Sequence, residues 1–183
     1  MRLVSLFAGF LALFTVATAH AATIKDPENT LLMQLKDGTV VIELHPEVAP
    51  NHVKRLKELT RKGFYNGLVF HRVIEGFMAQ TGDPTGTGAG GSDLPDLKAE
   101  FNSMKHITGT VSMARTDNPD GANSQFFICF NPVPMLDGKY TVFGQVIDGM
   151  QFVHHIKKGD AEKNGLVSNP DKIIRMTVAA DAK

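Results

Sequence analysis

The sequence predicts a mainly β domain, in which one antiparallel sheet closes on itself or forms a sandwich and two helices cover its open ends. The first observation behind this fold class is that runs with strand-like alternation outnumber the two stretches with helical periodicity. The second is that short turn sequences separate most of these runs. Glycine, which favours turns, also accounts for 17 of the 183 residues.

Residues 1–21 have the pattern of a secretory signal peptide. Arg2 precedes an uncharged apolar run over 3–16, and small residues lead to Ala21, where cleavage is expected. A cut two residues earlier and an uncleaved anchor are the alternatives, although the run is short for a membrane span. We therefore expect export to the periplasm, or secretion from a cell without an outer membrane. The mature chain, 22–183, has no repeat or linker and is expected to form one domain away from the membrane.

The mature chain begins with a hairpin that leads into an amphipathic helix. Residues 31–35 and 39–44 are strand-like, and a Lys-Asp-Gly turn joins them. Over 46–62 the apolar residues change to a three-residue spacing, with charged residues between them. Pro50 suits the first turn of this helix, and Gly63 suits its end.

An arginine stands at the centre of the next strand pair, which is expected over 70–74 and 77–81. Because side chains alternate along a strand, Arg72 and Gln80 can share one polar face. A buried arginine needs partners, and a glutamine orients the guanidinium without neutralising it. The alternative is an ordinary hairpin on which Arg72 forms a surface ion pair with Glu75.

A glycine-rich loop follows over 82–91. It contains a literal G-x-G-x-x-G at Gly86, Gly88 and Gly91. A dinucleotide fingerprint should open a helix within a βαβ unit, but Pro95 soon follows and no such unit surrounds the loop. The sequence favours a flexible turn beside a site over a phosphate cradle.

The second half of the chain continues the alternation of strands and turns. Further strands are expected over 109–115, 124–130, 140–146 and 173–178, and a second helix over 148–158. Within them, one residue of the Phe126-Phe127 pair should enter the core and the other can line a pocket. Cys129, the only cysteine, is predicted to be a buried and inert thiol. Surface or capping positions are expected for His45, His52 and His106.

With these segments in place, the chain resembles the cyclophilins, which are peptidyl-prolyl cis-trans isomerases. The resemblance runs from about residue 30 to residue 178 and implies a closed eight-stranded antiparallel barrel capped by two helices, without metal or cofactor. Its motifs are Phe-His-Arg-Val-Ile at 70–74, Gly-Phe-Met-Ala-Gln-Thr-Gly-Asp at 76–83, Ser-Gln-Phe-Phe-Ile at 124–128, Leu-Asp-Gly at 136–138 and Val-Phe-Gly at 142–144.

The resemblance also implies the site. Arg72 would be the catalytic residue, beside an apolar pocket for proline. The substrate-binding residues would be His71, Phe77, Met78, Gln80, Ala114, Arg115, Gln125, Phe127, Leu136 and Tyr140.

Four positions depart from the pattern of many members of the family. Arg115 replaces a common asparagine, and Glu75 replaces a common proline. Met135 and Tyr140 stand where cyclosporin-sensitive members have tryptophan and histidine. These changes are similar to those of bacterial exported cyclophilins, and they leave Arg72 and the apolar pocket unchanged.

The expected partners are proline-containing peptides and unfolded client proteins, bound by a monomer. A net charge of zero gives no reason to expect nucleic acid. The competing function is a binding module or holdase that recognises proline without turnover. Arg72 with Gln80 favours an enzyme, because a pure binder has no need for a buried cation.

Overall fold

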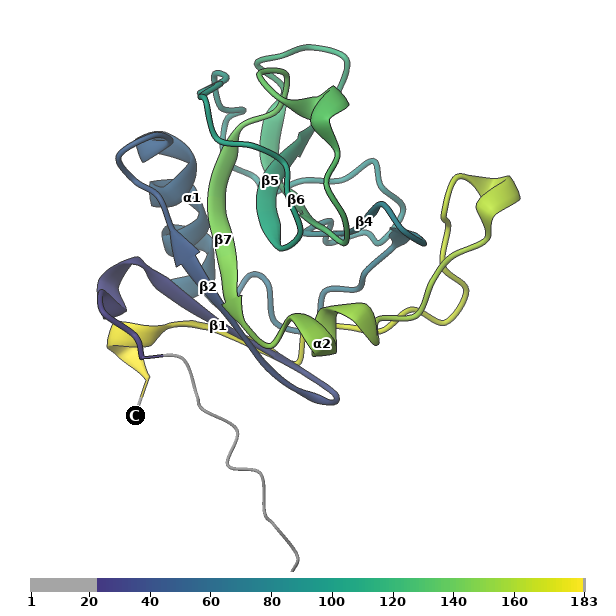
Figure 1. Ribbon diagram of the computed structural model, residues 1–183, viewed down its shortest axis with the longest axis horizontal. Helices are drawn as coiled ribbons and strands as arrows, with labels where there is room; N and C mark the ends of the chain where they lie inside the picture. Colours follow the sequence, from purple (N-terminus) through teal and green to yellow (C-terminus); the bar gives the residue numbers. More distant parts are fainter. Residues whose placement is uncertain (1–22, 183) are drawn as a thin grey trace, which may run out of the picture.

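An antiparallel sheet of eight strands forms the body of the protein (Figure 1), for which a computed structural model describes residues 23–182. The predicted signal peptide therefore lies outside the described residues. The strands are β1 (Thr30–Leu35), β2 (Gly38–Leu44), β3 (Arg72–Ile74), β4 (Met78–Thr81), β5 (Thr110–Arg115), β6 (Ala122–Cys129), β7 (Val142–Asp148) and β8 (Arg175–Val178).

The sheet is an open half-barrel, so the prediction of a closed barrel is wrong. The strand order is β3-β4-β6-β5-β7-β2-β1-β8, which leaves β3 and β8 as edges that form no ladder with each other. These edge strands have only three and four residues. Irregular chain before each of them makes the contact instead: the N–H of Gly67 donates to the carbonyl of Ile173 at 2.7 Å, and the N–H of Phe70 donates to the carbonyl of Asp171 at 2.9 Å.

Helix α1 (Pro50–Arg61) is shorter at its start than the stretch expected over 46–62. Pro50 occupies its first turn, as predicted, because a proline there forgoes no helical hydrogen bond. The carboxylate of Glu100 accepts hydrogen bonds from the N–H groups of Asn51 and His52, both at 3.1 Å, and so satisfies free donors of this end. The apolar face of the helix packs into the core.

Helix α2 (Met150–His154) is a single short turn of helix rather than the predicted stretch over 148–158. Asp148 ends β7, and Gly149 turns the chain with a φ of 82°, a conformation that favours glycine. Phe152 then packs over Gly38 at the β1–β2 turn. The described part of the chain also contains four 3₁₀ turns: η1 (Pro27–Asn29), η2 (Pro134–Leu136), η3 (Ala161–Lys163) and η4 (Ala179–Asp181). Within residues 23–182, no helix has the length and apolar character to cross a membrane.

Strand β6 contributes side chains to two separate apolar clusters. Phe126 belongs to the main core, where its ring meets the edges of Tyr65 at 5.6 Å and Phe143 at 6.2 Å between centroids. Phe127 and Cys129 point the other way, into a smaller cluster beneath a cavity. The expectation that one phenylalanine is core and the other faces a pocket is confirmed. Cys129 is buried as predicted, and this burial, with a smaller effect of Asp137, raises the pKa of its thiol to about 12.

Candidate active site

The β3–β4 hairpin places an arginine beside a glutamine. Arg72 lies opposite Gln80 in the ladder, and Ile74 lies opposite Met78. This is the register that alternation of side chains predicts. Gly76 turns the chain between the strands with a φ of 71°, which a glycine adopts without strain.

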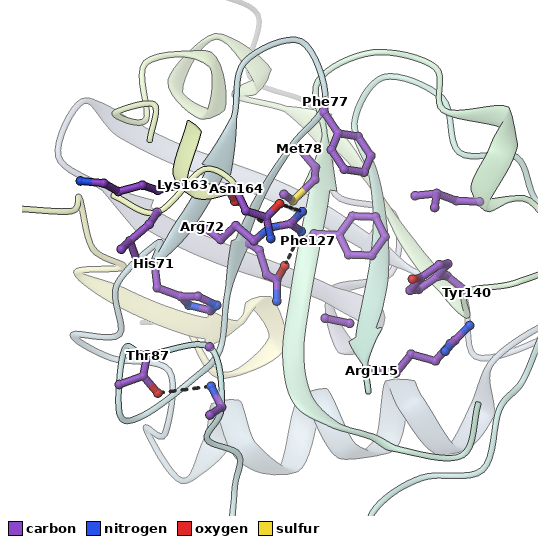
Figure 2. Close-up of a pocket in the computed structure, with 16 residues that line it drawn as sticks. His71, Arg72, Phe77, Met78, Thr87, Arg115, Phe127, Tyr140, Lys163 and Asn164 are labelled. Atoms are coloured by element: carbon purple, nitrogen blue, oxygen red, sulfur yellow. Dashed lines mark hydrogen bonds between the residues drawn. The ribbon is translucent and has the colours of Figure 1, made fainter. Parts of the chain in front are cut away.

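The guanidinium of Arg72 is half-buried and has only neutral partners within the described chain (Figure 2). Its Nη1 donates to Oε1 of Gln80 at 3.2 Å, its Nε to the backbone carbonyl of Asn164 at 3.1 Å, and its Nη2 to Oδ1 of Asn164 at 2.9 Å. Glu75 lies 3.9 Å from Nζ of Lys158 instead, so the alternative of an Arg72–Glu75 ion pair is wrong. Burial lowers the pKa of Arg72, but an arginine remains charged at any physiological pH.

A chain of amides fixes the orientation of Gln80. Nε2 of Gln125 donates to the carbonyls of Gly88 at 3.0 Å and Gly90 at 2.8 Å. Its Oε1 is therefore left to accept from Nε2 of Gln80 at 2.9 Å. Gln80 must then turn its own oxygen toward Arg72, because one amide cannot present its nitrogen in both directions. The glycine-rich loop thus orients Arg72 through two side chains.

An apolar wall stands beside the guanidinium and borders a cavity of about 590 Å³. Phe127 meets the edge of Tyr140 at 5.9 Å and stacks on His106 at 6.1 Å, so the position of its ring is well defined. Every residue that the sequence predicted for the site, apart from Gln125, lines this cavity: His71, Arg72, Phe77, Met78, Gln80, Ala114, Arg115, Phe127, Leu136 and Tyr140. Gln125 lines an adjoining hollow that shares Gln80, Gly88, Ala89, Ala114 and Arg115 with the cavity.

Arg115 lies at the rim of the cavity, away from Arg72 (Figure 2). Its guanidinium lies over the ring of Tyr140, 4.6 Å from the centroid, and donates to the backbone carbonyls of Lys139, Thr116 and Asp117. These contacts tie together two loops at the rim. Each nitrogen of the Arg115 guanidinium therefore already donates to a backbone carbonyl of the protein.

His71 is a buried histidine that lines the cavity, with 3% of its surface exposed. Neither ring nitrogen has a hydrogen-bond partner among the described residues. Burial is the main effect on this group and lowers the pKa of its imidazole, although the carboxylate of Asp83 acts in the opposite direction. Burial of His71 therefore favours the uncharged form of its imidazole.

The glycine-rich loop is built on Asp83, which is 1% exposed. Its carboxylate accepts hydrogen bonds from the backbone N–H and hydroxyl of Thr85 and from the N–H of Gly88. Burial alone raises the pKa of Asp83, but these hydrogen bonds outweigh it and hold the pKa at about 2. The loop is thus ordered by an ionised carboxylate and presents Thr87, Gly88 and Ala89 to the cavity.

We expect the stabilisation from Asp83 to be lost in acid. The folded-state pKa of about 2 lies below the ordinary value of 3.8, so the contribution is complete above pH 4 and disappears as the pH falls toward 2. Urea unfolding of the wild type and of Asp83→Asn at several pH values measures it, since the other carboxylates are common to both proteins. The difference in unfolding free energy should shrink below pH 4. Parallel pH profiles for the two proteins would contradict the assignment.

The structure adds six residues to the cavity that the sequence did not predict for the site: Thr87, Gly88, Ala89, Lys163, Asn164 and Leu166. The first three belong to the loop that was interpreted as a turn beside a site. The last three come from a segment that follows this loop by more than 70 residues in the sequence, and no motif marks them. Backbone pairing along the free edge of β3, as in the bridge between Arg72 and Leu166, brings that segment to the site.

Residues 30–178 match the family described as cyclophilin type peptidyl-prolyl cis-trans isomerase/CLD. A protein named probable peptidyl-prolyl cis-trans isomerase from Brucella suis biovar 1 (strain 1330) is 51% identical over 187 aligned positions, which cover 96% of this chain and 95% of that protein. Peptidyl-prolyl cis-trans isomerase B of Bacillus subtilis (strain 168) is 44% identical over 131 positions, which cover 70% of this chain and 91% of that protein.

Solved cyclophilin structures share the fold. Cyclophilin AquaCyp293 from Hirschia baltica superposes with a TM-score of 0.77 at 29% identity, over 86% of this chain and 76% of that chain. A cyclophilin type isomerase from Cryptosporidium parvum, determined in the presence of the dipeptide Ala-Pro, superposes with a TM-score of 0.74 at 30% identity, over 81% of this chain and 98% of that chain.

Proposed function

We propose that this chain, which belongs to the cyclophilin-type peptidyl-prolyl cis-trans isomerases and is therefore an isomerase, acts on exported proteins. Its role would be to accelerate X-Pro isomerisation while these proteins fold. In this proposal Arg72 stabilises the twisted amide, and the apolar side chains beside it hold the proline ring. The substrates are proline-containing peptides and unfolded client proteins, bound by a monomer. The Ala-Pro dipeptide used with the Cryptosporidium protein supports this substrate class.

The reaction requires rotation about a bond and breaks none. Amide resonance imposes a barrier of roughly 18–20 kcal/mol between two isomers of similar free energy. Rotation without a catalyst takes tens of seconds or more, which is slow enough to limit folding. Catalysis therefore means binding the twisted amide more tightly than either planar form.

Arg72 is suited to that task because the twisted amide differs from the planar one in its electronic structure. As conjugation is lost, the prolyl nitrogen becomes pyramidal and regains a lone pair that can accept a hydrogen bond. A fixed and permanently charged donor aimed at this nitrogen stabilises the twisted form selectively. The observation that carries the proposal is that Arg72 has neutral partners, Gln80 and Asn164, beside an apolar cavity, so its charge is not neutralised.

Catalysis also requires that the proline ring stays bound while the preceding carbonyl rotates, and the apolar wall can bind it. Phe77, Met78, Phe127 and Leu136 offer a surface without hydrogen-bonding groups to one side of the guanidinium. Binding of the pyrrolidine ring there would bring the prolyl nitrogen within reach of Arg72. The carbonyl before proline would then be free to rotate.

A protease-coupled assay with an Ala-Pro peptide tests the proposal. We expect the slow phase of cleavage to accelerate in proportion to the concentration of the purified protein. A holdase without turnover is the alternative, and it would bind the peptide, detectable by calorimetry, while leaving the slow phase unchanged.

Export is the second part of the proposal and is based on the sequence pattern of residues 1–21. We expect mass spectrometry of fractionated native cells to find the protein outside the cytoplasm, with a new N-terminus at or near residue 22. Recovery of the full-length precursor from the cytosol as the main form would contradict this prediction. Such a result would leave the isomerase assignment unaffected.

A further inference from the structure

We propose that Asn164 is a positioning residue for Arg72, which it holds by two hydrogen bonds while leaving the charge of the guanidinium unpaired. The inference rests on the proposed role of Arg72 in isomerisation. Asn164 lies against Arg72 in the cavity (Figure 2), although it comes from the loop after α2. No motif of the sequence marks it.

The geometry of the contact resembles that of an ion pair. The backbone oxygen of Asn164 accepts from Nε of Arg72 at 3.1 Å, and its Oδ1 accepts from Nη2 at 2.9 Å. Two oxygens of one residue thus occupy two neighbouring donors of the guanidinium. A carboxylate commonly makes this two-point contact with arginine. Here the same two-point grip comes from a residue without charge.

A count of donors shows what remains for a substrate. A guanidinium has five N–H groups. The Nε–H and one N–H of Nη2 donate to Asn164, and one N–H of Nη1 donates to Gln80. One N–H on each terminal nitrogen is left without an acceptor among residues 23–182. Arg72 is therefore fixed through three donors and retains two, together with its full charge, for a ligand in the cavity.

The backbone of the loop holds Asn164 in place. Gly165 donates to the carbonyl of Asp160 at 2.8 Å, Val73 donates to the carbonyl of Gly165 at 2.8 Å, and Gly159 donates to the carbonyl of Val73 at 2.9 Å. The loop is thereby attached to the free edge of β3, the strand that carries Arg72. A Cβ on Gly165 would lie 2.4 Å from the side chain of Ile74, so this close approach requires glycine.

The backbone at position 164 restricts which residues can serve. Asn164 is left-handed, with φ 53° and ψ 34°, a conformation that asparagine and aspartate tolerate better than other residues with a side chain. Of these two, aspartate would make the same contacts but would place a negative charge 2.9 Å from Nη2. That charge would compete with the prolyl nitrogen for the guanidinium, so the neutral residue fits the proposed chemistry.

Asn164→Asp tests the proposal with the smallest change of shape. We expect kcat/KM for a proline peptide at pH 7 to fall about tenfold, a limited loss because the position is exposed and solvent screens the charge. The activity of the variant relative to wild type should recover as the pH falls and the new carboxyl group is protonated. A protease-free NMR exchange assay allows the pH series. A purely structural role would not produce this pH profile.

Asn169→Asp is the matched control. Asn169 is also exposed and left-handed, with a φ of 51°, and it lies five residues further along the same loop but outside the cavity. The substitution makes the same chemical change in the same backbone conformation, so kcat/KM should stay within about twofold of wild type. Equal losses in both variants would overturn the proposal.

A double-mutant cycle shows whether Asn164 acts through Arg72. In an Arg72→Ala background, assayed at higher protein concentration, Asn164→Asp should cause little further loss. The same tenfold loss in both backgrounds, or full activity of Asn164→Asp at pH 7, would overturn the inference. If Arg72→Ala itself kept wild-type activity, the proposed function of Arg72 would fail instead. Asn164→Gly keeps the left-handed backbone and the contact of the carbonyl with Nε but removes the side-chain contact with Nη2. If both contacts position Arg72, its kcat/KM should lie between those of the wild type and Arg72→Ala.

Discussion

Replacing Arg72 with alanine is expected to lower kcat/KM for a proline peptide by about 10²–10³, while the protein remains folded. Removal of one well-placed donor to a developing charge costs about 3–4 kcal/mol of transition-state stabilisation, which gives this range. The fold should survive because Arg72 is only half-buried and its three hydrogen bonds go to neutral groups near the surface of the site. The protease-coupled assay measures the loss, and thermal unfolding checks that the variant is folded.

Arg115→Ala provides a comparison for Arg72→Ala. Both arginines line the same cavity, but the donors of Arg115 are directed to backbone carbonyls and its guanidinium lies over Tyr140. We expect kcat/KM for a proline peptide to fall much less in Arg115→Ala than in Arg72→Ala. Comparable losses would mean that the overall positive charge of the cavity matters more than one aimed donor. Retention of most turnover by Arg72→Ala would refute the role assigned to it.

The position of Arg72 beside Gln80 could be predicted because it depends on local rules. The two strands are neighbours in sequence, and alternation along a hairpin decides which side chains share a face. The structure pairs Arg72 with Gln80 as expected. The same rule separated Phe126 from Phe127. Both results depend on a few adjacent residues rather than on the arrangement of the whole chain.

Closure of the sheet could not be predicted in this way, because it depends on two edge strands, β3 and β8, that are far apart in sequence. The resemblance to cyclophilins implied a closed barrel, but β3 and β8 form no ladder with each other, and irregular chain before each of them makes the contact instead. For the same reason the sequence did not place Asn164 near Arg72. Pairing along an edge strand over about 90 residues leaves no periodic signal at either partner.

Two histidines show another limit of sequence interpretation. His52 and His106 were expected at surface or capping positions, but they are 0% and 1% exposed. Nδ1 of His52 lies 2.6 Å from Glu100, and Nδ1 of His106 lies 3.0 Å from Asp137. A carboxylate distant in sequence forms a hydrogen bond with each imidazole and so offsets the cost of burying a polar ring. The pattern of a single sequence does not identify such a partner.

Phe126→Ala is expected to be strongly destabilising, with a loss of about 3–5 kcal/mol in the free energy of unfolding. Phe126 is fully buried, and its ring lies between the rings of Tyr65 and Phe143. Truncation would leave a cavity closed on all sides by the main core, which the surrounding sheet cannot collapse to fill. Urea unfolding followed by circular dichroism measures the change.

Phe127→Ala is the matched control, since it makes the same truncation one residue further along β6. Phe127 is 5% exposed and borders the cavity beside Arg72, so its removal enlarges an open hollow rather than creating a sealed void. We expect a smaller loss of stability than for Phe126→Ala and a larger loss of kcat/KM per folded molecule. If both variants lost stability and activity to the same extent, the division of β6 between a structural face and a functional face would be wrong. The opposite ranking would mean that the smaller cluster, rather than the main core, holds the sheet together.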